Sequence, residues 1–349
     1  MTRPASKPPV AVHLVLPGSV RPWTATGLTV RRGDRVTLLG SGRINWGDGH
    51  GGAKYHLWGR VPGGRIFGCT QDTATVVADR SGPLELCVYL GCWADASGTL
   101  AVGHDAYGPE RGSLDVTVLH WPRDADPVDG LATLPDGMAD PALARAERSR
   151  LQDPVVPPAG WNYLLDVGPG DIFRHAAADG RPAIEVHCHD DAGVLEKDVD
   201  VELTAGTTVE WSWRVETLPG RGPENTPWSH DLLGVSAVLD DGPGARRSSS
   251  ITWFWSTTLE PEDDTFVCPA RAHVEHAAHV PVRRGAAGLG RWRRETRDVW
   301  SDHGRFVGPS PARLASLRLV AVSHFGHGTG RAAFRDVVLN TAGRRIQVL

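Results

Sequence analysis

Short runs of alternating apolar and polar residues, most of them closed by glycine, proline or aspartate, recur along nearly the whole chain. The 349 residues include 41 glycines and 26 prolines, and long helical patterns are nearly absent. Such runs are typical of strands that bury one face and end at tight turns, because Gly, Pro and Asp adopt the backbone angles that turns need. The pattern predicts an all-β protein, and the length allows two domains with separate cores.

The strand pattern is interrupted once. Residues 8–121 carry the first series of predicted strands. Residues 122–160 are rich in proline, aspartate and alanine, and we expect a linker with one short helix over Pro141–Leu151, capped by Asp140. Strands return over 161–349, in a number that suits two packed sheets. The sequence therefore predicts two jelly-roll-like β-sandwiches joined by this linker.

Composition excludes several classes of partner and cofactor. The net charge of −4 and the pI of about 6.4 disfavour a nucleic-acid partner, which normally meets a basic surface. We see no signal peptide and no run long enough to cross a bilayer, so we expect a cytoplasmic protein that does not bind membranes. Motifs for nucleotide binding and for serine hydrolases are missing, and we expect no nucleotide or organic cofactor. The oligomeric state stays open.

Three stretches of the first region share a pattern of turn glycines and strands: "WTATGLTVRRGDRVTLLGSGRINWG", "HLWGRVPGGRIFG" and "YGPERGSLDVTV". This region resembles the PA-I type bacterial galactophilic lectins and related galactose-binding-like β-sandwiches. In that family a calcium ion near the final hairpin coordinates sugar hydroxyls. The matching stretch here is Asp105–Ser113, in which Pro109 and Glu110 stand where the family carries two asparagines.

The resemblance implies a sugar site in the first region. Asp95, Asp105 and Glu110 could form a cage of hard oxygens for calcium, and we expect His50 and Tyr107 to contact a sugar. The alternative is that these acids are solvated turn residues, which aspartate and glutamate in glycine-rich loops usually are.

The stretch "VEWSWRV" places residues of different character on the two faces of a predicted strand. Trp211, Trp213 and Val215 share one face, which we expect to fill the core. Glu210 and Arg214 share the other. A mid-strand arginine beside a carboxylate is either a structural ion pair or an anchor for carboxylate, phosphate or vicinal hydroxyls.

The stretch "ITWFWSTT" carries an aromatic residue on both faces, so this strand is expected to be covered on both sides. We count Trp253 and Trp255 among the candidate ligand-binding residues, together with Glu210 and His324. His230 and Asp231 begin the next strand and could act as acid and base. We predict that Arg214, His230 and Asp231 face one pocket and are the catalytic residues if the protein is an enzyme.

The stretch "EVHCHDD" puts His187 and His189 on one face of a strand, a spacing found in metal sites. A third ligand would have to come from elsewhere, for example Asp231, His276, His279 or His324. The alternative is a pair of surface histidines, since this spacing alone discriminates poorly.

Several motifs of the second region occur in a fixed order: "TVEWSWRVETLP", "SITWFWSTTLEP", "VPVRRGAAGLGRWRRETRDVWSDHGRFVG" and "AAFRDVVLN". This region, about residues 160–345, resembles the bacterial family known as domain of unknown function 3047. The resemblance implies an all-β, jelly-roll-like fold and no particular activity.

Three functions are consistent with these patterns. The first is a two-module protein that binds a carbohydrate or glycoconjugate. The second is an enzyme of the lyase, hydrolase or cyclase type, acting on a sugar or a secondary metabolite in the jelly-roll cleft. The third is a structural or partner-binding protein with neither cleft in use. The shape and lining of the cleft distinguish them.

Overall fold

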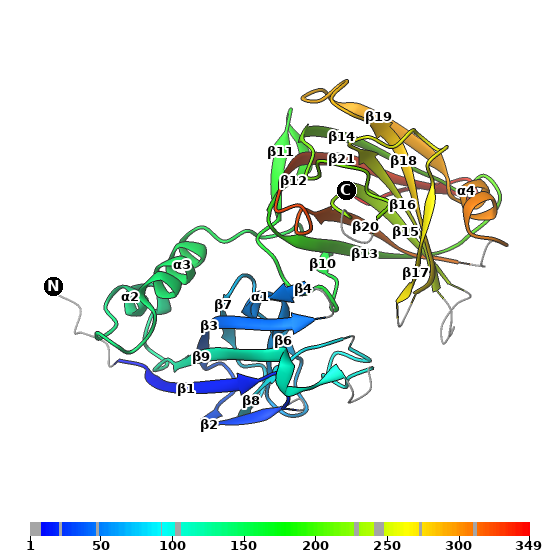
Figure 1. The fold of residues 1–349 in the computed structure, drawn as a ribbon. Coiled ribbons are helices and arrows are strands. Elements are labelled where there is room, and N and C mark those ends of the chain that lie inside the picture. Colours follow the sequence, from blue (N-terminus) through cyan, green and yellow to red (C-terminus); the bar gives the residue numbers. More distant parts are fainter. Residues whose placement is uncertain are drawn as a thin grey trace. The chain divides into compact units, whose positions relative to one another are not determined.

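The chain divides into two compact units. A computed structural model describes residues 8–20, 23–46, 49–91, 93–101, 106–226, 230–240, 248–271, 274–309 and 313–349 (Figure 1). The first unit comprises Met1–Pro154 and Leu165–Gly170, and the second comprises Val155–Leu164 and Asp171–Leu349. The chain thus crosses into the second unit, returns briefly to the first, and then completes the second.

The first unit is a sandwich of a five-stranded and a four-stranded sheet (Figure 1). The five-stranded sheet contains β1 (Val10–Pro17), β3 (Arg35–Trp46), β4 (Gly49–Gly51), β7 (Thr73–Val77) and β9 (Gly112–His120). The four-stranded sheet contains β2 (Thr24–Val30), β5 (Leu57–Arg60), β6 (Phe67–Gly68) and β8 (Gly82–Val88). The short helix α1 (Ala53–His56) and the 3-10 turn η2 (Pro109–Arg111) connect strands of this unit.

Strand alternation builds the core of the first unit. Leu38, Val116 and Val118 are almost completely buried and pack in one apolar cluster. Between β2 and β3 the backbone of Gly33 has a φ of +88°, a conformation that glycine adopts without steric cost. Gly33 therefore allows the tight turn between these two strands.

Two helices follow β9, where the sequence predicted a linker with one. They are α2 (Pro127–Ala132) and α3 (Pro141–Gln152). Leu131 of α2 and Ala144 of α3 pack in one buried cluster with Trp121. The segment is therefore part of the first unit, because its apolar side chains cover an apolar area on the outside of the five-stranded sheet.

The second unit is a sandwich of a seven-stranded and a six-stranded sheet (Figure 1). In sheet order, the first contains β10 (Asn162–Tyr163), β13 (Ala192–Glu202), β20 (Arg313–Val322), β15 (Leu233–Asp240), β16 (Ser248–Ser256), β18 (Val274–Arg284) and β17 (Phe266–Arg271). The second contains β11 (Phe173–Ala178), β12 (Arg181–His189), β21 (Thr329–Thr341), β14 (Thr208–Thr217) and β19 (Arg293–Asp298), with β22 (Arg344–Gln347) beside β21. Helix α4 (Val299–Phe306) follows β19.

Four tryptophans from the two sheets meet in the core of the second unit. Trp211 of β14 and Trp253 of β16 have ring centroids 5.8 Å apart, and Trp213 and Trp255 are 5.5 Å apart. All four are fully buried. Burying an indole contributes roughly 2 kcal/mol or more, so these rings are a main source of the attraction between the sheets.

The predicted fold class, two β-sandwiches, is confirmed. No helix in the part of the chain that the structure describes is long and apolar enough to cross a membrane.

Candidate functional site

An open cleft of about 360 Å³ lies on the face of the six-stranded sheet that points away from the core. We call it the charged cleft, after the seven ionisable side chains that line it. These are Asp171, Arg174, Glu185, His187, Arg214, Glu216 and Arg331. Alternation along β12, β14 and β21 produces this face, because the residues between these positions point into the core.

Strand register arranges the charged side chains in two rows. In the first row Arg174 pairs with Glu185, Glu185 with Ala333, and Ala333 with Arg214. Ala333 has only a methyl group and is 3% exposed, so it forms a floor between the longer side chains of Glu185 and Arg214. In the second row His187 pairs with Arg331.

Arg214 is held from two sides. Its guanidinium Nη2 lies 3.1 Å from Oε1 of Glu216, and its Cζ lies 5.3 Å from the ring centroid of Trp292, a favourable cation–π distance. The Nε atom of Arg214 is buried and has no acceptor among the described residues. The guanidinium is therefore oriented by the protein while part of its donor capacity is unused.

His187 is predominantly neutral near pH 7. Partial burial lowers its pKa, and the positive charges of Arg331 and His189 lower it further. A neutral imidazole can accept a proton or a hydrogen bond, whereas the neighbouring guanidinium of Arg331 only donates.

Several predicted ligand-binding residues of the second unit are structural. Trp253 and Trp255 do not face a ligand, because both are fully buried in the core. Their indole N–H groups donate to Oδ2 of Asp302 and to the carbonyl of Gly285. Glu210 lies on the outer face but accepts hydrogen bonds from Arg294 and Asn340, and these bonds, with that of Arg294 the largest cause, lower its pKa.

The pocket predicted to unite Arg214 with His230 and Asp231 is not formed. Arg214 belongs to the six-stranded sheet, whereas Asp231 lies two residues before β15 of the seven-stranded sheet. Asp231 is 1% exposed, and its two oxygens accept hydrogen bonds from the backbone N–H groups of Phe325 and Gly326. Its carboxylate therefore fixes a turn instead of facing a substrate.

His230 lies in a cluster of aromatic rings. Its Nε2 is 3.2 Å from Nε2 of His279, and its Nδ1 is 3.2 Å from the carbonyl oxygen of Glu224. With both rings neutral, His230 can donate from Nδ1 and accept from His279. The ring of His279 in turn stacks on Phe266 at 5.1 Å.

The histidines considered as metal ligands make other contacts. Nδ1 of His189 lies 2.7 Å from Oγ1 of Thr329, and Nδ1 of His324 lies 3.3 Å from Asp190. Within the described ranges there is no group of three or more His, Cys, Asp or Glu side chains that could hold a metal ion.

The predicted sugar and calcium residues of the first unit make mostly local contacts. The hydroxyl of Tyr107 donates to the carbonyl of Val88 at 3.1 Å. His50 lies in β4, where the structure describes its backbone, paired with that of Asn45.

The three acids take separate roles. Oδ1 of Asp95 accepts hydrogen bonds from Ser97 and from Thr99, which lower its pKa. Glu110 is largely exposed and lies 3.4 Å from Arg111. Asp105, the third acid of the predicted calcium cage, lies outside the described residues.

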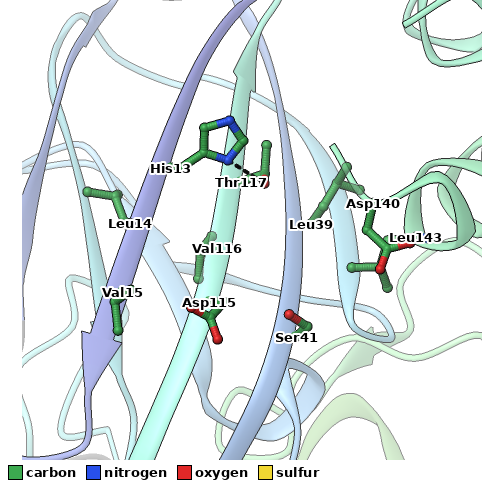
Figure 2. Close-up of a pocket in the computed structure, with 10 residues that line it drawn as sticks. All are labelled: His13, Leu14, Val15, Leu39, Ser41, Asp115, Val116, Thr117, Asp140 and Leu143. Carbon is green, nitrogen blue, oxygen red and sulfur yellow. Dashed lines mark hydrogen bonds between the residues drawn. The ribbon is translucent and has the colours of Figure 1, made fainter. Parts of the chain in front are cut away.

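The first unit has a smaller hollow of about 220 Å³ on the outer face of its five-stranded sheet. Figure 2 shows its lining from β1, β3, β9 and the start of α3, with Nδ1 of His13 3.0 Å from Oγ1 of Thr117. Asp115 and Asp140 add carboxylates, and Leu39 an apolar patch. This hollow has no guanidinium and includes none of the residues predicted for a site.

Sequence reasoning singled out Arg214 and His187 but missed most of the cleft. Arg331 directly precedes the motif "AAFRDVVLN" and Ala333 is its second residue, and their spacing of two already placed them on one face of a strand. Glu185 likewise shares a face with His187. Alternation within each strand indicated which side chains share a face. It could not show that β12, β21 and β14 are neighbours in the sheet.

The chain matches one family model, described as "Protein of unknown function (DUF3047)", over residues 164–338, which is half of the chain. No curated protein matches it.

Solved structures match at low similarity. The EclA N-terminal domain, a PllA-like lectin, is 16% identical, covers 31% of this chain and 95% of its own, and has a TM-score of 0.25. The xyloglucanase domain of NopAA from Sinorhizobium fredii is 9% identical over 53% of this chain and 94% of its own, with a TM-score of 0.31. The CBM22 tandem of Xyn10C from Paenibacillus barcinonensis is 10% identical over 98% and 100%, with a TM-score of 0.25. At these values we draw no ligand or activity from them.

Proposed function

The chain belongs to the DUF3047 family, and because the description of that family names no activity, we propose from the geometry of the second unit that the protein binds a glycan or glycoconjugate in the charged cleft. The observation that carries this proposal is the alternation of guanidinium and carboxylate groups around the small floor of Ala333.

A polyhydroxylated ligand suits this lining because each hydroxyl both donates and accepts a hydrogen bond. Carboxylates such as Glu185 accept from hydroxyls, and guanidiniums such as Arg214 donate to them. Bonds to charged groups are stronger than neutral ones. The ring of Trp292, which lies against Arg214, fixes the guanidinium before the ligand arrives, and pre-organisation lowers the cost of binding.

The same lining disfavours other ligand classes. An apolar ligand would leave the charged groups desolvated without partners, which is costly. A nucleic-acid backbone would meet three carboxylates, Asp171, Glu185 and Glu216, beside the three arginines, and the whole chain carries a net charge of −4.

The test is a glycan array and calorimetry on the full chain with a matched pair of variants. Ala333→Leu fills the floor of the cleft and leaves every charge in place, so we expect it to abolish or strongly weaken binding. Ala177→Leu makes the same change at an exposed alanine of β11 and should leave binding intact. Equal binding by both variants would place the ligand elsewhere. If the wild type bound none of the glycans, the proposal would be refuted.

An enzyme of the lyase or hydrolase type is the second candidate for this cleft. The favouring observation is that His187, whose pKa is lowered, shares the cleft with Asp171, Glu185 and Glu216. A neutral imidazole and nearby carboxylates are the groups that proton transfer requires. Mass spectrometry of a bound oligosaccharide after incubation separates the two functions, because only an enzyme releases shorter products.

A further inference from the structure

The second row of the charged cleft differs from the first in its charge balance. In the first row Glu185 stands between Arg174 and the floor residue Ala333. In the second row His187 pairs with Arg331, and Arg331 pairs with Thr217 on the next strand. No carboxylate therefore stands between the groups of this row.

Arg331 has no ion pair with a carboxylate among the residues that the structure describes. Other arginines of this sheet are paired: Arg214 with Glu216 at 3.1 Å, and Arg335 with Asp179 at 2.6 Å. Arg331 is exposed on the same face. A guanidinium at the rim of a cleft and without a carboxylate partner is available for an anionic group of a ligand.

Arg331 acts electrostatically on His187, its partner in this row. Its charge is one of the causes that hold the pKa of His187 below its ordinary value, after partial burial. The charge of His189 acts in the same direction. An anion placed between Arg331 and His187 would be attracted by the first and would favour the charged form of the second.

We propose that the row of His187 and Arg331 binds the carboxylate of an acidic sugar, so that the ligand of the charged cleft is a glycan containing uronic acid. The inference rests on the proposed glycan binding. Arg331 would donate two parallel hydrogen bonds to the carboxylate, a geometry that its planar group matches. Glu185 and Arg214 would hold the hydroxyls of the same sugar.

A carboxylate fits better here than a phosphate monoester, which carries close to two negative charges at pH 7. Glu185 and Glu216 line the same cleft and would repel a second negative charge on a phosphate. A sugar carboxylate has one charge, a planar shape matching one guanidinium, and hydroxyls nearby for the carboxylates of the protein.

The experiment compares two forms of one ligand on the full chain. Uronic-acid oligosaccharides are titrated by calorimetry at low salt beside the same oligosaccharides with each carboxyl reduced to a primary alcohol. We expect the acidic form to bind at least about tenfold more tightly, the effect of one charge-assisted contact. Arg331→Gln should bring the two affinities together. Arg181→Gln, at an exposed arginine of β12 outside the cleft, should leave both as they are.

Each alternative result of these titrations contradicts a specific step of the proposal. Equal affinity of the wild type for both forms would overturn the acidic ligand and leave glycan binding standing. A preference that survives Arg331→Gln would overturn the assignment to this row. Binding of inorganic phosphate or sulfate with no oligosaccharide bound would make this a simple anion site, and the failure of every oligosaccharide to bind would overturn both proposals.

Discussion

Trp211 and Trp253 are equally buried, but among the described residues only the indole N–H of Trp253 has a hydrogen-bond acceptor. Nε1 of Trp253 donates to Oδ2 of Asp302 at 2.8 Å, and Arg297 donates to the same carboxylate. Nε1 of Trp211 is buried without an acceptor among the described residues. The two positions therefore separate the contribution of ring burial from that of the hydrogen bond.

We expect Trp253→Phe to lower the free energy of unfolding more than Trp211→Phe, by about 1–3 kcal/mol. Both variants lose similar ring area. Only Trp253→Phe removes a hydrogen bond from the nearly buried carboxylate of Asp302, whereas Trp211→Phe removes an N–H for which the described residues provide no acceptor. Urea unfolding followed by circular dichroism measures the difference. Equal losses would show that the bond to Asp302 has no net effect on stability.

His187 gives the proposed ligand a pH dependence with a definite sign. The groups around it are Asp171, Arg174, Glu185, His189, Arg214, Glu216 and Arg331. In the free protein its pKa lies below 6.5, and an anionic ligand would raise it in the complex. Binding then takes up a proton, so affinity for an acidic oligosaccharide should rise as the pH falls from 7 through the window between these two pKa values.

Calorimetry in two buffers of different ionisation enthalpy measures this proton uptake. We expect His187→Gln to remove it and to flatten the pH profile of affinity. A variant that still takes up the same fraction of a proton would assign the titration to another group.

At the residue scale the sequence predicted the direction of side chains better than their interaction partners. Alternation correctly placed Trp211 and Trp213 inward and Arg214 outward. The carboxylate paired with Arg214 is Glu216 and not Glu210, which the sequence offered as the partner in one of two alternatives. Glu216 lies two positions after Arg214 and shares its face by alternation. Glu210 instead accepts hydrogen bonds from Arg294 of β19 and Asn340 of β21, and the pattern within one strand does not reveal partners on its neighbours.

At the scale of elements, α3 shows how a local signal and a long-range one differ. Asp140 caps the helix as predicted, accepting hydrogen bonds from the backbone N–H groups of Ala142 and Leu143 at 2.7 and 3.3 Å. The packing of α2 and α3 on the sheet was not predicted. Proline, aspartate and alanine gave the segment a linker-like composition, and its few apolar residues are recognisable as a covering layer only beside Trp121.

We expect Asp140→Ala to destabilise the first unit by about 1 kcal/mol, because the first turn of α3 loses its cap. Asp136→Ala is the matched control, since Asp136 lies in the exposed loop before α3. Thermal melting of the full chain should show a lower transition for the first unit in the Asp140 variant alone. An unchanged transition would mean that packing on the sheet, and not the cap, holds α3 in place.

At the scale of the whole molecule, the sequence was sufficient for the class of fold but not for the site. Each sandwich follows from strand patterns that are local. The charged cleft combines β11, β12, β21 and β14, and the order of these strands in the sheet depends on long connections and on which apolar faces pack together. Arg174 and Arg331 are far apart in the chain, and they line the same cleft only because of this strand order.

Both units contain a buried histidine that should make them sensitive to mild acid. His56 of the first unit and His303 of the second are at most 5% exposed. Their Nδ1 atoms lie 2.7 Å from the carbonyl of Tyr89 and 3.1 Å from that of Gly308. Burial is the largest cause that lowers the pKa of both imidazoles.

The sign follows from the unfolded state, in which histidine has a pKa of about 6.5. Below that pH the unfolded chain binds protons that the folded protein excludes, so the stabilisation is complete above about pH 6.5 and declines as the pH falls toward the folded pKa. We expect calorimetry of the full chain to show both melting transitions moving to lower temperature between pH 7 and pH 5. His56→Gln should reduce this dependence only in the first unit and His303→Gln only in the second, while His175→Gln, at an exposed position, should change neither. A variant that keeps the full pH slope of its own unit would show that its histidine is not the titrating group.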